Sequence, residues 1–264
     1  MGIANLKGAA IGYDDSGKGK TIVLVHGHPF NRSMWSAQSK LLKATYRVVT
    51  PDLRGYGEST ITTGKVKLED HATDIRDLLD HLGVDRIILG GLSMGGQIVM
   101  EFYRQFPERI DALILADTFA QLDTPQGRES RIKTADRLIR EGMNDYAAEV
   151  LPKMITPVNI KSQPGLAAEV LKMMQNTAPE GAAASLRGRA ERRDYVPFLP
   201  EITVPTLIVV GREDEFTPVS DAEFMRGLIP NSKLEVIEGA GHMPNMERES
   251  EFNVVLMHWL TSIK

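Results

Sequence analysis

The sequence predicts an α/β protein in which helices cover both faces of a mostly parallel sheet. Short runs rich in Val, Ile and Leu alternate with longer amphipathic stretches along most of the 264 residues. Strands that are apolar throughout are typical of parallel sheets, because helices bury both sides of such sheets. The reactive groups of this class are expected at the carboxyl ends of the strands.

Each expected element follows from its hydrophobic pattern. Continuous apolar, β-branched runs predict strands, and apolar residues recurring every three or four positions predict helices, as along residues 68–82. Strands are expected at 21–25, 46–50, 86–92, 112–116, 205–210 and 233–237. Helices outside the central region are expected at 34–44, at 68–82, directly after residue 93 and at 249–263.

The central region breaks this alternation. Residues 119–200 contain helical patterns punctuated by prolines, and no convincing strand. Because the region leaves from the carboxyl end of a strand, we expect a helical cap over the site rather than a subdomain with only a stabilising role. The expected core domain is 1–118 plus 201–264, and the expected cap is 119–200. Its helices are expected at 128–142, 145–154, 166–176 and 180–191.

Composition and charge exclude several classes of protein. The net charge of −4 and the pI near 5.9 offer no basic surface for nucleic acid or an anionic membrane. The absence of cysteine excludes disulfides, thiolate metal sites and a cysteine nucleophile. With no secretory signal pattern and no apolar stretch of transmembrane length, a cytoplasmic location is expected.

The segment Gly91-Leu92-Ser93-Met94-Gly95 carries the strongest chemical signal. It lies between an expected strand and an expected helix. In that setting G-x-S-x-G places the serine on a sharp, strained turn with its hydroxyl exposed, and the glycines leave room for the turn. The segment therefore predicts a nucleophile elbow with Ser93 as the nucleophile.

A serine hydroxyl needs a base that takes its proton. His242 follows the last expected strand after two small residues, Ala240 and Gly241, and is the expected base. His71 and His81 lie between carboxylates on one amphipathic helix, where a solvated face is expected.

The base in turn needs a carboxylate that orients it. Glu213, Asp214 and Glu215 follow the penultimate strand, and Asp117 follows an earlier one. Asp214 is preferred because α/β enzymes with a nucleophile elbow supply these groups in the order Ser, Asp, His. Asp117 remains the alternative.

The oxyanion of an acyl-transfer reaction needs backbone N–H donors held in place beforehand. Met94 N–H, directly after the nucleophile at a helix N-terminus, is one expected donor. The second is expected from the loop after the first apolar strand. Pro29 cannot donate, which leaves His28 or Phe30, and His28 is preferred.

Together these segments resemble the α/β-hydrolase family over essentially the whole chain. The matching stretches are 26–29, 51–59, the Ser93 elbow, the Asp214 loop and 241–242. Within the family the chain is similar to small bacterial carboxylesterases, 3-oxoadipate enol-lactonases and cofactor-free haloperoxidases. The resemblance implies an eight-stranded, mostly parallel sheet with a helical cap inserted after the sixth strand. Since the sequence contains no phosphate-binding P-loop, dinucleotide fingerprint or HExxH motif, no cofactor or metal is expected.

Carried over by position, the resemblance implies a triad of Ser93, His242 and Asp214 with oxyanion donors at His28 and Met94. Position 28 is usually aromatic and apolar in similar enzymes, so His28 is a departure. A serine at position 93 argues against epoxide hydrolase and haloalkane dehalogenase chemistry, which needs a carboxylate there.

The expected activity is hydrolysis of carboxylic esters with small to medium acyl chains, by a monomer or homodimer acting on a small-molecule ester or lactone. The same triad serves enol-lactone hydrolysis and perhydrolysis, the latter suggested by His28-Pro29. A slow-turnover, ligand-binding signalling protein is the alternative from another class. Four side chains are expected to line an acyl pocket, with ordinary core packing equally open for each: Phe30, Phe119, Phe216 and Met243.

Four arginines gather at the end of the expected cap, at positions 187, 189, 192 and 193. They could recognise a substrate carboxylate, as an enol-lactone acid would require. Because Glu191 and Asp194 are interleaved with them, a salt-bridged surface is the preferred expectation.

Overall fold

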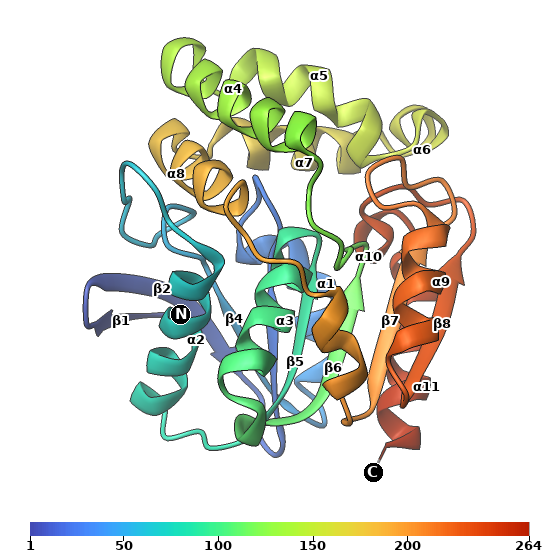
Figure 1. Ribbon diagram of the computed structural model, residues 1–264. Helices are drawn as coiled ribbons and strands as arrows, with labels where there is room; N and C mark the ends of the chain where they lie inside the picture. Colours follow the sequence, from blue (N-terminus) through green and yellow to red (C-terminus); the bar gives the residue numbers. More distant parts are fainter. Residues whose placement is uncertain (264) are drawn as a thin grey trace.

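The computed structural model describes residues 1–263, and eight strands in it form one sheet (Figure 1). The strand order is β1-β2-β4-β3-β5-β6-β7-β8, with antiparallel pairing of β1 to β2 and of β2 to β4 and parallel pairing elsewhere. This confirms the predicted class and the eight-stranded, mostly parallel sheet. The strands are β1 Gly2–Leu6, β2 Ala9–Ser16, β3 Thr21–Val25, β4 Arg47–Pro51, β5 Ile87–Leu92, β6 Ile110–Ala116, β7 Thr206–Gly211 and β8 Ser232–Ile237.

The first two strands were not identified from their own pattern. They form a hairpin at the edge of the sheet, and most of their residues are half-buried or exposed. A strand that is not covered on both faces lacks the continuous apolar run that identified the other strands. Their existence was implied only by the family resemblance.

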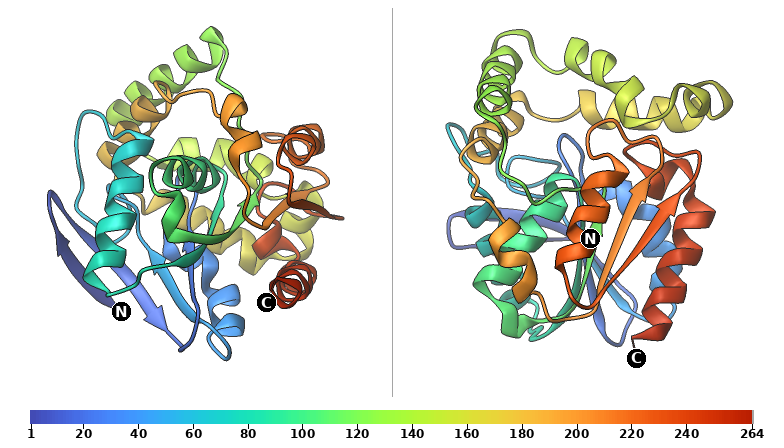
Figure 2. Two further views of the ribbon diagram at one scale, coloured as in Figure 1. Left: turned by 60° about the horizontal axis from the view of Figure 1, so that its bottom comes forward. Right: turned by 45° about the vertical axis from the view of Figure 1, so that its right-hand side comes forward.

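Helices cover both faces of the sheet (Figures 1 and 2). Side chains of β3 alternate between two cores: Val23 and Val25 face one, Ile22 and Leu24 the other. On the first face lie α2 Leu68–His81, α3 Met94–Gln105 and α9 Val219–Leu228. On the second face lie α1 Ser36–Leu42 and α11 Glu249–Ser262. The remaining short elements are η1 Arg32–Trp35, η2 Pro107–Arg109, η3 Val196–Glu201 and α10 Pro244–Glu247.

Five helices connect β6 to β7 and lie together above the sheet (Figure 1). The predicted helical insertion after the sixth strand is thus confirmed. The six-residue α6 was not expected, because it is too short to show a helical period. These helices are α4 Pro125–Glu141, α5 Asn144–Met154, α6 Pro157–Ser162, α7 Pro164–Gln175 and α8 Pro179–Arg189. Within residues 1–263, every helix is too short or too polar to cross a bilayer.

The expected solvated face of α2 is correct for His81 and wrong for His71. His71 is fully buried, and its Nε2 lies 3.4 Å from Ser185 Oγ of α8. Burial lowers the pKa of His71 to about 3, with smaller contributions from His26 and Arg54. The helical period of α2 shows which face packs on the sheet, but only the fold shows that α8 covers another face.

We predict that His71→Gln makes the stability of the protein less sensitive to acid. The unfolded chain protonates His71 near pH 6.5, whereas the folded chain resists protonation until about pH 3. Stability is therefore lost as the pH falls through this window, by up to about 1.4 kcal/mol per pH unit for one such histidine. Glutamine keeps a hydrogen-bonding group near Ser185 and does not titrate.

The measurement is urea unfolding of both proteins at pH 7 and pH 5. The loss of unfolding free energy between these pH values should be about 2 kcal/mol smaller in the variant. Equal losses in the two proteins would show that His71 does not resist protonation in the folded state.

Candidate active site

Ser93 lies on the sharp turn that joins β5 to α3. Its backbone has φ 58° and ψ −115°, a conformation that is rare for a residue with a side chain. Hydrogen bonds hold it: Ser93 N–H donates to Ala116 O at 2.9 Å, and Thr118 Oγ1 donates to Ser93 O at 2.8 Å. The strained turn expected from the sequence is therefore present.

The glycines beside Ser93 leave room for this turn. A Cβ on Gly95 would lie 2.4 Å from Val25 O, and a Cβ on Gly91 would lie 2.4 Å from the carbonyl of Gly95. Both distances are far below a normal contact. Helix α3 can therefore begin directly against β3 and β5 only because no side chain is present at these positions.

His242 and Asp214 meet at the carboxyl ends of β8 and β7. His242 Nδ1 lies 2.8 Å from Asp214 Oδ2, and both side chains are buried. The other oxygen, Oδ1, accepts hydrogen bonds from Phe216 N at 2.8 Å and Thr217 N at 3.2 Å, and the Thr217 hydroxyl also donates to the carboxylate. Burial favours a higher pKa for Asp214, but His242 and these hydrogen bonds lower it below its usual range.

Asp117, the alternative acid, lies beside this pair but does not contact His242 through a hydrogen bond among the described residues. Its Oδ1 accepts from Gly211 N–H at 2.9 Å. Burial, and then the charge of Asp214, raise the pKa of Asp117 well above its usual range. Among the described residues, His242 is therefore hydrogen-bonded to Asp214 and not to Asp117.

Asp117, Asp214 and His242 are also close enough to hold a metal ion in principle, since one ligand atom of each lies within 4.8 Å of the others. The hydrogen bond between His242 and Asp214 occupies Nδ1, and backbone and hydroxyl donors occupy Asp214. An ion at this position would have to displace these hydrogen bonds.

The loop after β3 carries the second expected oxyanion donor. Phe30 N–H donates to Gly27 O at 3.0 Å, so this group is already engaged. That hydrogen bond favours His28 N–H over Phe30 N–H as the donor. Met94 is the first residue of α3, where a backbone N–H has no intrahelical acceptor.

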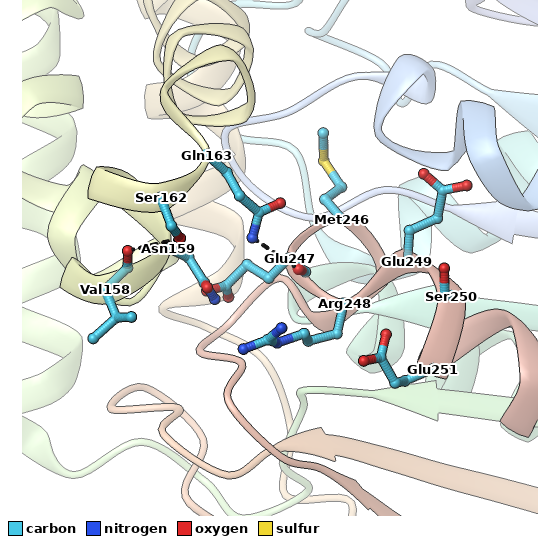
Figure 3. A pocket seen from close by; sticks show the side chains of 10 residues that line it. All are labelled: Val158, Asn159, Ser162, Gln163, Met246, Glu247, Arg248, Glu249, Ser250 and Glu251. Atoms are coloured by element: carbon cyan, nitrogen blue, oxygen red, sulfur yellow. Dashed lines mark hydrogen bonds between the residues drawn. The ribbon is translucent and has the colours of Figure 1, made fainter.

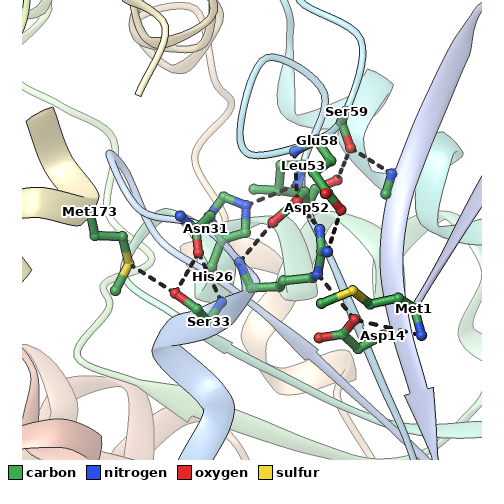
Figure 4. Close-up of polar contacts among 12 residues, drawn as sticks. Met1, Asp14, His26, Asn31, Ser33, Asp52, Leu53, Glu58, Ser59 and Met173 are labelled. Carbon is green, nitrogen blue, oxygen red and sulfur yellow. Dashed lines mark hydrogen bonds and ion pairs between the residues drawn. The ribbon is translucent and has the colours of Figure 1, made fainter. Parts of the chain in front are cut away.

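A buried polar network supports this loop (Figure 4). Asp52 accepts from Arg32 N–H at 2.8 Å and pairs with the Arg32 guanidinium, which also pairs with Glu58. His26 Nε2 accepts from Leu53 N–H at 2.9 Å, which places the ring proton on Nδ1, 2.8 Å from Gly27 O. The loop is thus tied to the segment after β4, which the family resemblance includes.

Ser93 and His242 face one cavity of about 160 Å³ between the sheet and the helices above it. Of the four expected pocket residues, Phe119 and Phe216 line the cavity. The Phe216 ring lies edge-on to the His242 ring, with 5.1 Å between the ring centroids. Phe30 and Met243 do not line it, because both are fully buried in the core beneath. The lining residues are His28, Ser93, Phe119, Arg131, Tyr146, Met154, Leu186, Arg189, Phe216, Thr217 and His242.

The His28 side chain joins the core to the helices above. Its Nδ1 lies 2.9 Å from Tyr56 OH and its Nε2 lies 3.4 Å from Tyr146 OH of α5. Burial lowers the pKa of His28 to about 3, helped by the charges of Arg189 and Arg131. The imidazole is therefore neutral at physiological pH and acts only as a hydrogen-bonding group.

Sequence reasoning missed part of the cavity wall. The expected salt-bridged surface is correct for Arg187 and Arg193, which pair with Asp136 at 2.8 Å and with Glu69 at 3.3 Å. It is wrong for Arg189 and Arg192, which are buried. Arg189 is buried and lines the cavity. No sequence signal marked Arg131 or Tyr146, which lie on helices far from the elbow in the chain.

A larger open hollow of about 400 Å³ lies beside α6 and α10 (Figure 3). Glu247 separates it from the His242 loop by accepting hydrogen bonds from Gly241 N at 2.7 Å and from Thr156 N and Asn159 Nδ2 at 2.8 Å. Neither Ser93 nor His242 lines this hollow, and both line the smaller cavity.

Residues 20–249 match the model of the alpha/beta hydrolase fold family. The chain belongs to the α/β-hydrolase family. A thermophilic esterase from Thermogutta terrifontis is 38% identical with a TM-score of 0.95, over 97% of this chain and 94% of that chain. An enol-lactonase from Burkholderia xenovorans is 27% identical with a TM-score of 0.93, over 98% of this chain and 100% of that chain. The 3-oxoadipate enol-lactonase 2 of Acinetobacter baylyi is 33% identical over 224 residues, 84% of this chain and 82% of that protein.

These similarities identify this α/β-hydrolase as a hydrolase of small molecules. They also confirm the family, and the esterase and enol-lactonase resemblance, that the motifs predicted.

We predict that Gly95→Ala destabilises this α/β-hydrolase, because the new methyl group would overlap Val25 O and His26 O. Forcing an atom into such a packed site costs about 1–3 kcal/mol or more. The matched control is Gly165→Ala in α7, where no atom lies near the new Cβ, and alanine there should be neutral or stabilising by up to about 1 kcal/mol. Urea unfolding measures both; equal stability of the two variants would contradict the close approach.

Proposed function

We propose that this α/β-hydrolase cleaves small carboxylic esters through an acyl-enzyme formed on Ser93. One observation carries the proposal: His242 bonds Asp214 through Nδ1 and faces, together with Ser93, the same cavity. A histidine that donates its Nδ1 proton to a carboxylate has a lone pair on Nε2, and it can take a proton there.

In the proposed reaction, Ser93 Oγ attacks the ester carbonyl carbon while His242 Nε2 takes the hydroxyl proton. The tetrahedral intermediate collapses, His242 gives that proton to the leaving alcohol, and the acyl group remains on Ser93. Water then attacks the acyl-enzyme with His242 again as base, and the carboxylic acid and free Ser93 are regenerated. Asp214 stays ionised and stabilises the imidazolium in each half-reaction.

Two backbone donors support the intermediates. We assign the oxyanion to the N–H groups of His28 and Met94, and the N-terminal end of α3 adds a favourable dipole. The bond that Phe30 N–H makes to Gly27 O favours this assignment.

We further propose that residues 119–200 act as a cap that limits substrate size. The cavity of about 160 Å³ is smaller than the ~300–1,000 Å³ of typical drug-sized ligand sites. Its wall also carries polar groups such as Tyr146 and Arg189, which suit short acyl groups better than long alkyl chains. The T. terrifontis esterase was solved with malate bound, a small polar acid.

Lactones are a second proposed substrate class. The similarity to enol-lactonases supports it, and a lactone is a cyclic ester that the same steps would open. In that case the leaving oxygen remains attached to the acyl product.

We predict that p-nitrophenyl acetate through butyrate are hydrolysed with higher kcat/KM than octanoate and decanoate, because the small cavity excludes long chains. Ser93→Ala should lower kcat by at least about 10³-fold while the protein remains folded by circular dichroism. Turnover that survives in the variant would exclude Ser93 as the nucleophile. A folded wild type with negligible turnover, tight ligand capture and no lactonase activity would instead favour the signalling alternative.

We also predict that the two buried aspartates differ in importance. Asp214→Asn should lower kcat by about 10³–10⁴-fold, because an amide can impose the wrong imidazole tautomer and does not stabilise the imidazolium. Asp117→Asn, which mimics a protonated carboxyl group, should lower kcat by less than about 10-fold. Steady-state kinetics on p-nitrophenyl acetate compares them, and a larger loss in Asp117→Asn would reverse the assignment of the acid.

A further inference from the structure

Arg189 is a buried cation that faces the cavity without an anion beside it. It ends α8, is 7% exposed, and lines the cavity with Ser93 and His242. Its Nε donates to Gln97 Oε1 at 2.7 Å. Among residues 1–263 it forms no ion pair, although burial of an uncompensated charge is costly.

The neighbouring charges do not supply the missing anion. Arg131 pairs with Asp123 at 2.7 Å, and Arg192 reaches the same carboxylate at 3.5 Å. Two guanidinium groups therefore share the Asp123 carboxylate, and Arg189 pairs with no carboxylate among the described residues. Burial, and then the charges of Arg131 and Arg192, lower the pKa of Arg189 well below its ordinary value. Arginine nevertheless stays protonated in proteins, so the cavity wall is electropositive.

Gln97 fixes the guanidinium relative to the nucleophile. It lies four residues after Ser93 on α3, on the order of 6 Å along the helix axis. The hydrogen bond to Gln97 uses Nε of Arg189, and no described residue accepts a hydrogen bond from its two Nη groups. A short, rigid path of covalent and hydrogen bonds therefore joins Ser93 to a cation that has free donors.

We propose that Arg189 binds a carboxylate of the substrate, so that the preferred ester substrates are half-esters of short dicarboxylic acids. This inference rests on the proposed ester hydrolysis and names its substrate class. A guanidinium group matches a carboxylate with two parallel N–H···O bonds, and the charge of Arg131 adds to the attraction. His28 and Tyr146 in the same wall are neutral, so neither side chain offers Arg189 an anionic partner that would compete with a substrate carboxylate.

The experiment compares two esters with five-carbon acyl chains, p-nitrophenyl hydrogen glutarate and p-nitrophenyl valerate. They differ mainly in the terminal carboxylate. We expect the wild type to have the higher kcat/KM for the glutarate ester. Arg189→Gln should lower kcat/KM for the glutarate ester by about 10- to 100-fold and for the valerate ester by less than about threefold.

The matched control is Arg187→Gln, which removes the same charge from the same helix at a surface ion pair with Asp136. It should leave the ratio of the two kcat/KM values within about twofold of the wild type. Equal losses on both esters in Arg189→Gln, or an unchanged ratio, would overturn the carboxylate assignment.

A binding measurement keeps the inference testable if Arg189→Gln folds poorly. Free glutarate should inhibit valerate hydrolysis competitively in the wild type, and more weakly in Arg189→Lys, which keeps the charge but not the paired donors. Valerate turnover with no preference for glutarate and no inhibition by it would overturn the inference and leave the proposed esterase standing. A folded wild type that hydrolyses neither these esters nor lactones would instead remove the proposed function itself.

Discussion

The close approach of α3 to the sheet is the constraint on which the site depends. Gly91 and Gly95 allow a backbone separation that any side chain would prevent, and Ser93 adopts a strained turn between them. The same geometry starts the helix at Met94, where a free N–H points out of the first turn. It also sets the position of Gln97 one turn later, and with it the guanidinium of Arg189. One packing constraint thus positions both the proposed nucleophile and the proposed carboxylate-binding group.

The two buried aspartates lie close together, and their pKa values are shifted in opposite directions. Asp117 and Asp214 lie too close together, and too far from water, for both to be ionised readily. Two backbone N–H groups, the Thr217 hydroxyl and His242 favour the charged form of Asp214. Among the described residues Asp117 accepts from Gly211 N–H alone, and burial beside Asp214 raises the pKa of Asp117 well above its usual range. The division of roles follows from the number of donors around each carboxylate rather than from residue type.

The cavity combines residues from two sources. Ser93, His242 and Asp214 lie on loops at the carboxyl ends of strands, where a parallel sheet brings distant segments together. Arg131, Arg189 and the other upper lining groups come from the helices between β6 and β7. Helix α8 comes close because it is rich in small residues; a Cβ on Gly188 would lie 1.7 Å from Val66 O. The core therefore presents the proposed reactive groups, and the inserted helices set the charge and size of the space above them.

The sequence by itself determined strands β3 to β8, most of the long helices, the elbow at Ser93, and the pairing of His242 with a carboxylate after β7; it did not determine β1, β2, α6 or α9. Those features depend on local periods, on glycines in one turn, and on the rule that carboxyl ends of parallel strands meet. Only the tertiary structure decided that His71 and Arg189 are buried and that Phe30 and Met243 pack beneath the cavity. Burial of a side chain depends on every element packed around it, and the period of one helix reports only the face it turns to the sheet. The alternating charges at the end of α8 are typical of a solvated surface. The helix is instead covered on nearly all sides, and its Arg189 side chain lines the cavity.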